Sequence, residues 1–100
     1  MPDTPPPLPT SVAFLVPFVR AILDSGREQD AMRKLWEVWS GGIGQGRFRA
    51  DDPALSPVAE LIAGFGGYEP NPQFCNPGAG MYDWTELQRR VNATLATITR

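Results

Sequence analysis

The stretch Val12–Leu23, VAFLVPFVRAIL, most constrains what this chain can fold into, because on a helix it is apolar on every side. Eleven of its twelve residues are apolar, counting Pro17, and only Arg20 is charged. One helical face would carry Val12, Leu15, Val16, Val19, Ile22 and Leu23, and the opposite face Phe14, Phe18 and Ala21. A helix that is apolar all round must be kept from water. We therefore expect it to be wrapped by its own chain or shared with a second polypeptide.

Length and composition describe one small helical domain. The chain has 100 residues, of which 42% are hydrophobic and 20% charged, which is typical of a globular protein. Its 11 prolines and 10 glycines indicate long irregular connections. A domain of this size buries only about two thirds of its unfolded surface, so a fully apolar helix is hard to cover unaided. We predict a single helical domain over residues 11–100.

Residues 1–10 are predicted to be a disordered proline-rich tail. Five prolines fall among the first nine residues, and such a segment buries little apolar surface. The spacing of Pro6 and Pro9 also satisfies the bare PxxP pattern of peptides that dock in aromatic grooves. We favour the plain tail, because PxxP recurs by chance in any proline-rich segment.

The first predicted helix follows this tail, with Thr10 or Ser11 as its cap. Pro17 either bends this helix or marks an extended piece before a shorter helix. We favour the bend, because the apolar spacing runs through the proline without a phase break. The helix should end near residues 24–26, where Gly26 suits a left-handed closing position.

The second predicted helix begins at a capping box formed by Ser25 and Glu28. Its apolar face carries Met32, Leu35, Trp36 and Trp39 at helical spacing. The glycine-rich stretch 41–46 is expected to end it. This stretch fits neither phosphate-binding pattern, because Arg47 and Phe48 stand where a P-loop needs Lys and Ser or Thr.

Two further helices complete an all-α fold of four helices. The third is expected to start at Ser56–Pro57, a hydroxyl cap followed by proline, and to close at Gly66–Gly67. The fourth has a capping box of Asp83 and Glu86 and runs to the end of the chain. Residues 68–82 hold three prolines and two glycines, so we predict a long irregular loop before the last helix.

Candidate catalytic and metal-binding groups are few. Histidine is absent, which removes the usual general base and the commonest metal ligand. The single cysteine, Cys75, has no base to activate it, and the acidic residues do not cluster except at Asp51–Asp52. We therefore predict that the protein is not an enzyme and has no catalytic, cofactor-binding or metal-binding residues.

The charge pattern argues against nucleic acid and membranes. The net charge is −2, and the basic pair Arg47 and Arg49 is followed at once by two aspartates. The apolar run is well short of the roughly 20 residues that a membrane span needs. The start of the chain lacks the basic segment of a signal peptide. With one cysteine and no internal disulfide, a cytoplasmic location is the expectation.

What remains is binding to another protein. Three tryptophans, five phenylalanines and two tyrosines are a large aromatic stock for one small domain, and aromatic residues are enriched at interfaces. We predict a non-enzymatic regulatory protein that acts as a homodimer through Val12–Leu23. An example is an anti-activator that sequesters a transcription factor or another oligomeric partner. The predicted interface residues are Phe14, Leu15, Val16, Phe18, Val19, Ile22, Trp36, Trp39, Phe74 and Tyr82.

Two alternatives remain open. The first is a nucleic-acid-associated transcriptional regulator, which would use Arg47, Arg49, Arg89 and Arg90. The second is a small-ligand carrier or enzyme accessory protein, which would enclose a cavity lined by Trp36, Trp39 and Phe65.

Overall fold

A computed structural model describes residues 9–99 of the chain, which form four α-helices and no β-strand. The helices are α1 (Thr10–Ala21), α2 (Glu28–Gly44), α3 (Ser56–Ala63) and α4 (Trp84–Ile98). The predicted all-α, four-helix fold is therefore confirmed. Of the predicted tail, residues 1–8 lie outside the described part of the chain.

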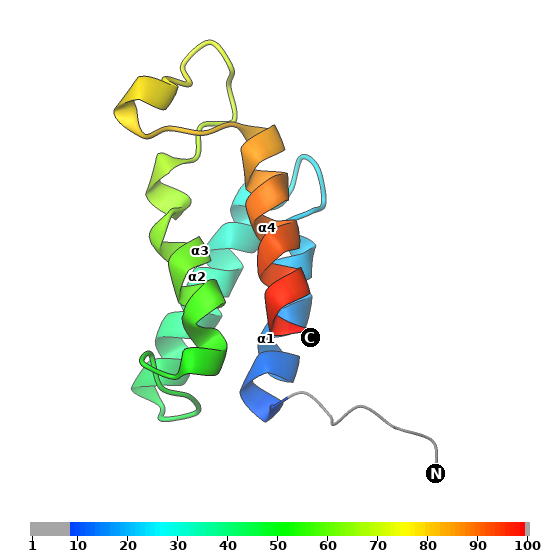
Figure 1. Ribbon diagram of the computed structural model, residues 1–100, viewed down its shortest axis with the longest axis vertical. Coiled ribbons are helices and arrows are strands. Elements are labelled where there is room, and N and C mark those ends of the chain that lie inside the picture. The colour runs from blue at the N-terminus through cyan, green and yellow to red at the C-terminus, as the bar shows by residue number, and fades with distance from the viewer. Residues whose placement is uncertain (1–8, 100) are drawn as a thin grey trace.

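The helices run alternately up and down, so that each is antiparallel to the next (Figure 1). Helix α1 contacts both α2 and α4, and α3 contacts both α4 and α2, which closes the four helices into a ring. One apolar core fills this ring. Its buried members are Val12, Leu15, Val19, Ile22, Met32, Leu35, Trp39, Phe48, Leu55, Val58, Leu61, Tyr82, Leu87, Val91 and Ile98.

Helix α1 is continuous through Pro17, so the alternative of an extended piece before a shorter helix is wrong. The proline lies on the exposed side of the helix, where a carbonyl group left without its N–H partner can reach water. The predicted hydroxyl cap is absent: Thr10 is already helical, and no side chain caps the first turn. The helix ends at Ala21, and Gly26 has the expected positive φ of 89° in the turn that follows.

Helix α2 differs from its prediction at both ends. Its start carries no Ser25 cap; instead the carboxylate of Glu28 accepts a hydrogen bond from the Gly26 N–H, at 2.8 Å. Its end passes through three of the glycines that were expected to break it and stops at Gly44. A tertiary contact explains the glycine at position 42. A Cβ built on Gly42 would lie 2.3 Å from the ring of Phe48, so packing of this ring requires glycine there.

The short helix α3 begins at Ser56 as predicted, with Pro57 in its first turn. Ser56 itself does not cap it. A 3₁₀ turn, Pro53–Leu55, precedes it, and the side chain of Asp52 caps that turn by accepting a hydrogen bond from the Ala54 N–H, at 2.9 Å. The carboxylate therefore directs the chain into α3 one turn before the predicted cap.

Helix α4 begins as its sequence predicts. The side chain of Asp83 accepts a hydrogen bond from the Glu86 N–H, at 3.1 Å, and Tyr82 just before it is buried. Between α3 and α4 the chain makes 3₁₀ turns at Phe65–Gly67 and Pro77–Ala79, and it is otherwise irregular, as predicted for residues 68–82. This loop, yellow in Figure 1, extends past the ends of the helices.

Candidate protein-binding surfaces

The face of α1 that points into the bundle is enclosed by the chain's own residues. Leu15, Val19 and Ile22 are 0% exposed and Val12 is 2% exposed. These four residues recur every three or four positions, which places them along one stripe of the helix. This stripe is core, and it has no surface left to offer a partner.

A second side of α1 turns toward α2 and is partly covered. Phe14 packs against Phe18 with ring centroids 5.6 Å apart, and the guanidinium of Arg47 lies 5.7 Å from the Phe14 ring centroid. Phe14, Val38 and Gly41 line a shallow hollow of about 240 Å³ between the two helices. Phe14 remains 39% exposed, so the cover over its ring is incomplete.

The ten predicted interface residues divide into three groups. Leu15, Val19, Ile22, Trp39 and Tyr82 are buried. Val16 and Phe18 are half-buried against the core. Phe14, Trp36 and Phe74 are exposed. The buried five are a correction to the prediction, because the four helices of a single chain already exclude water from them.

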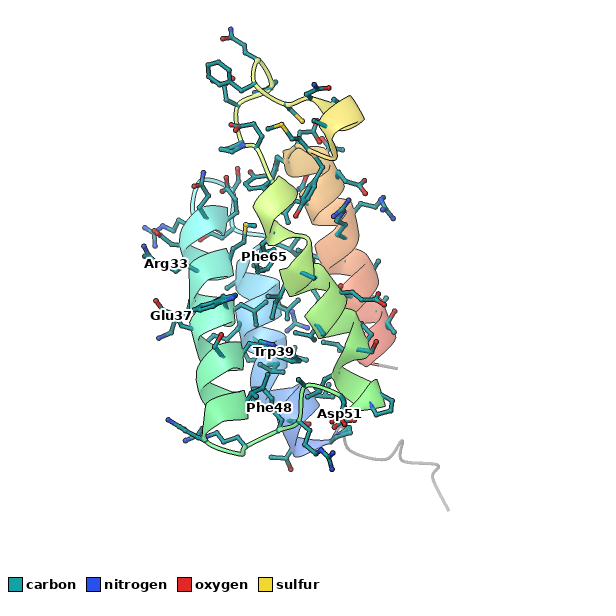
Figure 2. The ribbon with its side chains drawn as sticks, turned by 90° about the vertical axis from the view of Figure 1, so that its left-hand side faces the viewer. Arg33, Glu37, Trp39, Phe48, Asp51 and Phe65 are labelled. Carbon is teal, nitrogen blue, oxygen red and sulfur yellow. The ribbon has the colours of Figure 1, made fainter. Side chains whose placement is uncertain are left out.

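The three exposed aromatic side chains do not form one patch. Trp36 lies two residues from Val38, which is about 200° around a helix, so Trp36 points away from the hollow beside Phe14. Phe74 belongs to the loop of residues 68–82, which extends past the helix ends (Figure 1). The aromatic stock that suggested a surplus is largely core: Trp39 and Phe48, for example, pack inside the bundle with ring centroids 5.4 Å apart (Figure 2).

Within the described residues, two helical segments without charged side chains share one face of the bundle, and the sequence reasoning missed this pairing. Residues 10–19 of α1 and 91–99 at the end of α4 contain no Asp, Glu, Lys or Arg. The two helices are antiparallel and in contact, so these segments lie side by side at the same end of the bundle (Figure 1). We call this surface the uncharged face. Its exposed residues are Thr10, Ala13, Pro17, Asn92, Ala96 and Thr99. The run VNATLATIT, residues 91–99, was the sequence signal that could have predicted this face.

Most of the arginines proposed for nucleic-acid contact are paired with neighbouring acids. Arg49 forms an ion pair with Asp51 at 3.1 Å, and Glu86 bonds both Arg89 and Arg90. The Arg89 hydrogen bond, with a smaller contribution from Arg90, lowers the pKa of Glu86 to about 2. The carboxylate is therefore charged at neutral pH and offsets the two arginines. A phosphate backbone would have to compete with these pairs.

Two hollows of the described surface lie away from the residues predicted to line an aromatic cavity. An open groove of about 380 Å³ runs between α3 and α4. Its lining residues are Pro57, Glu60, Leu61, Arg89, Arg90, Ala93, Thr94 and Thr97. Trp36, Trp39 and Phe65 line neither this groove nor the hollow beside Phe14. Trp39 is 9% exposed and packs against Phe48, so its side chain belongs to the core.

Two tyrosines fix the loop of residues 68–82 to the bundle. The Tyr82 hydroxyl donates a hydrogen bond to the Gly64 carbonyl at 2.7 Å, and the Arg90 guanidinium lies 3.9 Å from the Tyr82 ring centroid. The Tyr68 hydroxyl donates to the Glu28 carboxylate at 3.0 Å. Burial and, after it, this carboxylate raise the pKa of Tyr68, and burial raises the pKa of Tyr82. Both hydroxyls thus stay protonated at neutral pH and can donate.

Within residues 9–99, no three His, Cys, Asp or Glu side chains are grouped closely enough to hold a metal ion. None of the helices in that range combines the length and the apolar character that crossing a membrane requires.

Comparison of the chain with protein-family models, with curated proteins and with solved structures gives no match.

Proposed function

We propose that this protein is a protein-binding domain that associates with a second copy of itself through the uncharged face. The observation that carries the proposal is the pairing of two charge-free helical segments, residues 10–19 and 91–99, on one side of the bundle. The prediction of a homodimer through α1 is retained in this form, with exposed Ala13 and Pro17 in place of the buried Leu15 and Val19.

The charge and the side-chain size of the uncharged face both favour a protein interface. Protein surfaces that face water usually have about 25–35% charged residues, whereas the centres of protein interfaces are depleted of charge. The small side chains of Ala13 and Ala96 would let a neighbouring helix approach closely. Since α1 and α4 are antiparallel, a two-fold axis can set α1 of one copy against α4 of the other, which makes the face self-complementary.

The proposal extends to a non-enzymatic regulatory role in the cytoplasm. A regulator that sequesters another protein, such as an anti-activator of a transcription factor, needs a charge-poor surface that competes with the target's own contacts. The absence of histidine and the single cysteine support a binding role in a reducing compartment over a catalytic one.

Oligomeric mass tests the proposal directly. Light scattering at micromolar concentration should give about twice the chain mass of 11.0 kDa. Ala13→Arg or Ala96→Arg places a charge on the uncharged face and should shift the mass to one chain, with unchanged helical circular dichroism because both positions are exposed. Ala63→Arg makes the same change at an exposed position of α3 and should leave the mass at two chains.

Two results would contradict the proposal. A mass of one chain for the unaltered protein removes the dimer. A mass of two chains that persists in Ala13→Arg and Ala96→Arg but disappears in Ala63→Arg moves the interface to α3.

A further inference from the structure

We infer that the loop of residues 68–82 is a second recognition element, which binds a different protein by placing the Phe74 ring in a neutral, apolar pocket. The inference goes beyond the proposed dimer, because the loop lies at the opposite end of the bundle from the uncharged face (Figure 1). Three properties carry it together: a fixed base, an ordered interior and an exposed aromatic side chain without nearby charge.

The base of the loop is fixed by the backbone. The Glu69 N–H donates to the Tyr82 carbonyl at 2.9 Å, and the Tyr82 N–H donates to the Gly67 carbonyl at 2.8 Å. The two sides approach so closely that a Cβ on Gly67 would lie 2.7 Å from the Gly80 carbonyl oxygen. With the Tyr68 and Tyr82 hydroxyl bonds, this closure connects both ends of the loop to the helices.

The interior of the loop is ordered by short polar contacts. The Asn71 side chain accepts a hydrogen bond from the Gln73 N–H at 3.0 Å, and the Asn71 carbonyl accepts one from the Phe74 N–H at 3.0 Å. Asn76 makes the same kind of contact with the Gly78 N–H, also at 3.0 Å. A loop that already has its bound shape loses less conformational entropy on binding, which favours tight association.

Phe74 is the exposed aromatic residue of this ordered loop. Its side chain is 67% exposed, the highest value among the large apolar residues of the described chain, whereas Tyr68 and Tyr82 at the base are partly or fully buried. An aromatic ring on an ordered, protruding loop is typical of the anchor residues that dominate protein interfaces.

The charge pattern selects the class of partner. Residues 70–82 contain no charged side chain, and the residues on either side, Glu69 and Asp83, are acidic. Nucleic acids and anionic lipid surfaces are recognised through lysine and arginine, which this loop lacks. A protein pocket without charge of its own fits both the ring and its surroundings.

Site-specific crosslinking followed by binding measurements tests the inference. We would replace Phe74 by p-benzoyl-phenylalanine in the full chain, and Trp36 in a matched control, since both positions carry an exposed aromatic residue. A protein that crosslinks in cells from position 74 and not from position 36 would then be purified. Calorimetry with this protein should show a Kd that rises at least about tenfold for Phe74→Ala and less than about twofold for Trp36→Ala.

The crosslink alone does not support the inference; the ratio of Kd values does. Equal binding by Phe74→Ala, or the absence of a crosslink specific to position 74, overturns it. A crosslink to a second copy of this chain overturns it in favour of self-association, and Phe74-dependent sedimentation with phosphatidylcholine vesicles overturns it in favour of a membrane. Phe74→Ala should leave the dimer mass unchanged, so failure here and failure of the proposed dimer are distinguishable.

Discussion

The two sides of helix α1 contain apolar residues in similar number, yet only one of them is core. The inward stripe consists of Val12, Leu15, Val19 and Ile22, all at most 2% exposed. The outward side carries Ala13, Pro17 and Ala21, all exposed. The difference lies in side-chain area: the free energy of burial follows the apolar surface removed from water, and alanine offers little of it.

The comparison shows what a count of apolar residues can and cannot predict. A helix whose outward residues are small can be apolar all round in sequence without exposing much apolar area. Phe14 is the one large exception, and Phe18 and Arg47 cover part of its ring. Support for a partner therefore comes from the charge-free segments 10–19 and 91–99, and not from surplus aromatic area.

The largest expected effect separates the inward and outward sides of α1. Val19→Asp places a carboxylate where the native side chain is 0% exposed, with no cationic partner provided. An unpaired buried charge costs about 3–5 kcal/mol, a large part of the stability of a small domain. Helical circular dichroism with urea should show an unfolded or strongly destabilised protein. Ala13→Asp, at an exposed position, should stay folded. An equal loss of stability in both variants would contradict the difference in burial between the two sides of α1.

Two adjacent glycines extend the comparison to α2. Gly42→Ala forces the Phe48 ring away from its place beside Trp39, and such overpacking costs about 1–3 kcal/mol. Gly41→Ala meets nothing within 4 Å and should stabilise the helix by about 0.5–1 kcal/mol. Urea unfolding of both variants measures the difference; a Gly42→Ala variant as stable as Gly41→Ala would show that the ring can move freely.

The starts of α1 and α4 provide a smaller contrast. Asp83→Ala removes the side-chain bond to the Glu86 N–H and should lower the free energy of unfolding by about 1 kcal/mol. Thr10→Ala removes no cap, because the first turn of α1 has none. Thermal melts should shift downward for the first variant and stay nearly constant for the second. A matching shift in both would mean that Thr10 supports α1 in another way.

The smallest expected effect concerns the free energy of unfolding at acidic pH. The pKa of Glu86 is lowered from 4.5 to about 2, chiefly by its hydrogen bond from Arg89. A carboxyl group with a lowered pKa in the folded state stabilises that state above its unfolded pKa. This contribution is lost as the pH falls from about 4.5 toward 2. Urea unfolding should show a smaller loss between neutral and acidic pH for Glu86→Gln than for the unaltered protein; an identical pH dependence would contradict it.

The elements that the sequence predicted well are those whose signals are local. Asp83 three residues before Glu86 places the start of α4, and Gly26 takes its left-handed conformation, because both signals act within one turn of backbone. The glycines of α2 misled the prediction, since the contact of Gly42 with Phe48 joins residues on either side of a loop. Ser25 failed as a cap because α2 begins at Glu28 with Arg27 at its N-cap position, which leaves Ser25 two residues too early.

The candidate surfaces were less predictable than the fold. The spacing of Trp36, Trp39 and Phe65 matches that of core residues. Only the packing of all four helices decides which of these side chains is exposed. The uncharged face combines segments about eighty positions apart in sequence, so its existence depends on the meeting of α1 and α4. The order inside residues 68–82 comes from individual asparagine contacts that have no periodic pattern.

The ring of helices also has a consequence for how the chain folds. Three of its four helix contacts join elements that are consecutive along the chain, and closing these contacts costs less chain entropy than pairing elements from the two ends of the chain. The contact of α1 with α4 is the exception, and it brings together the first and last helices. We therefore expect the first three contacts to assemble early and the closure by α4 to set the rate of the final step.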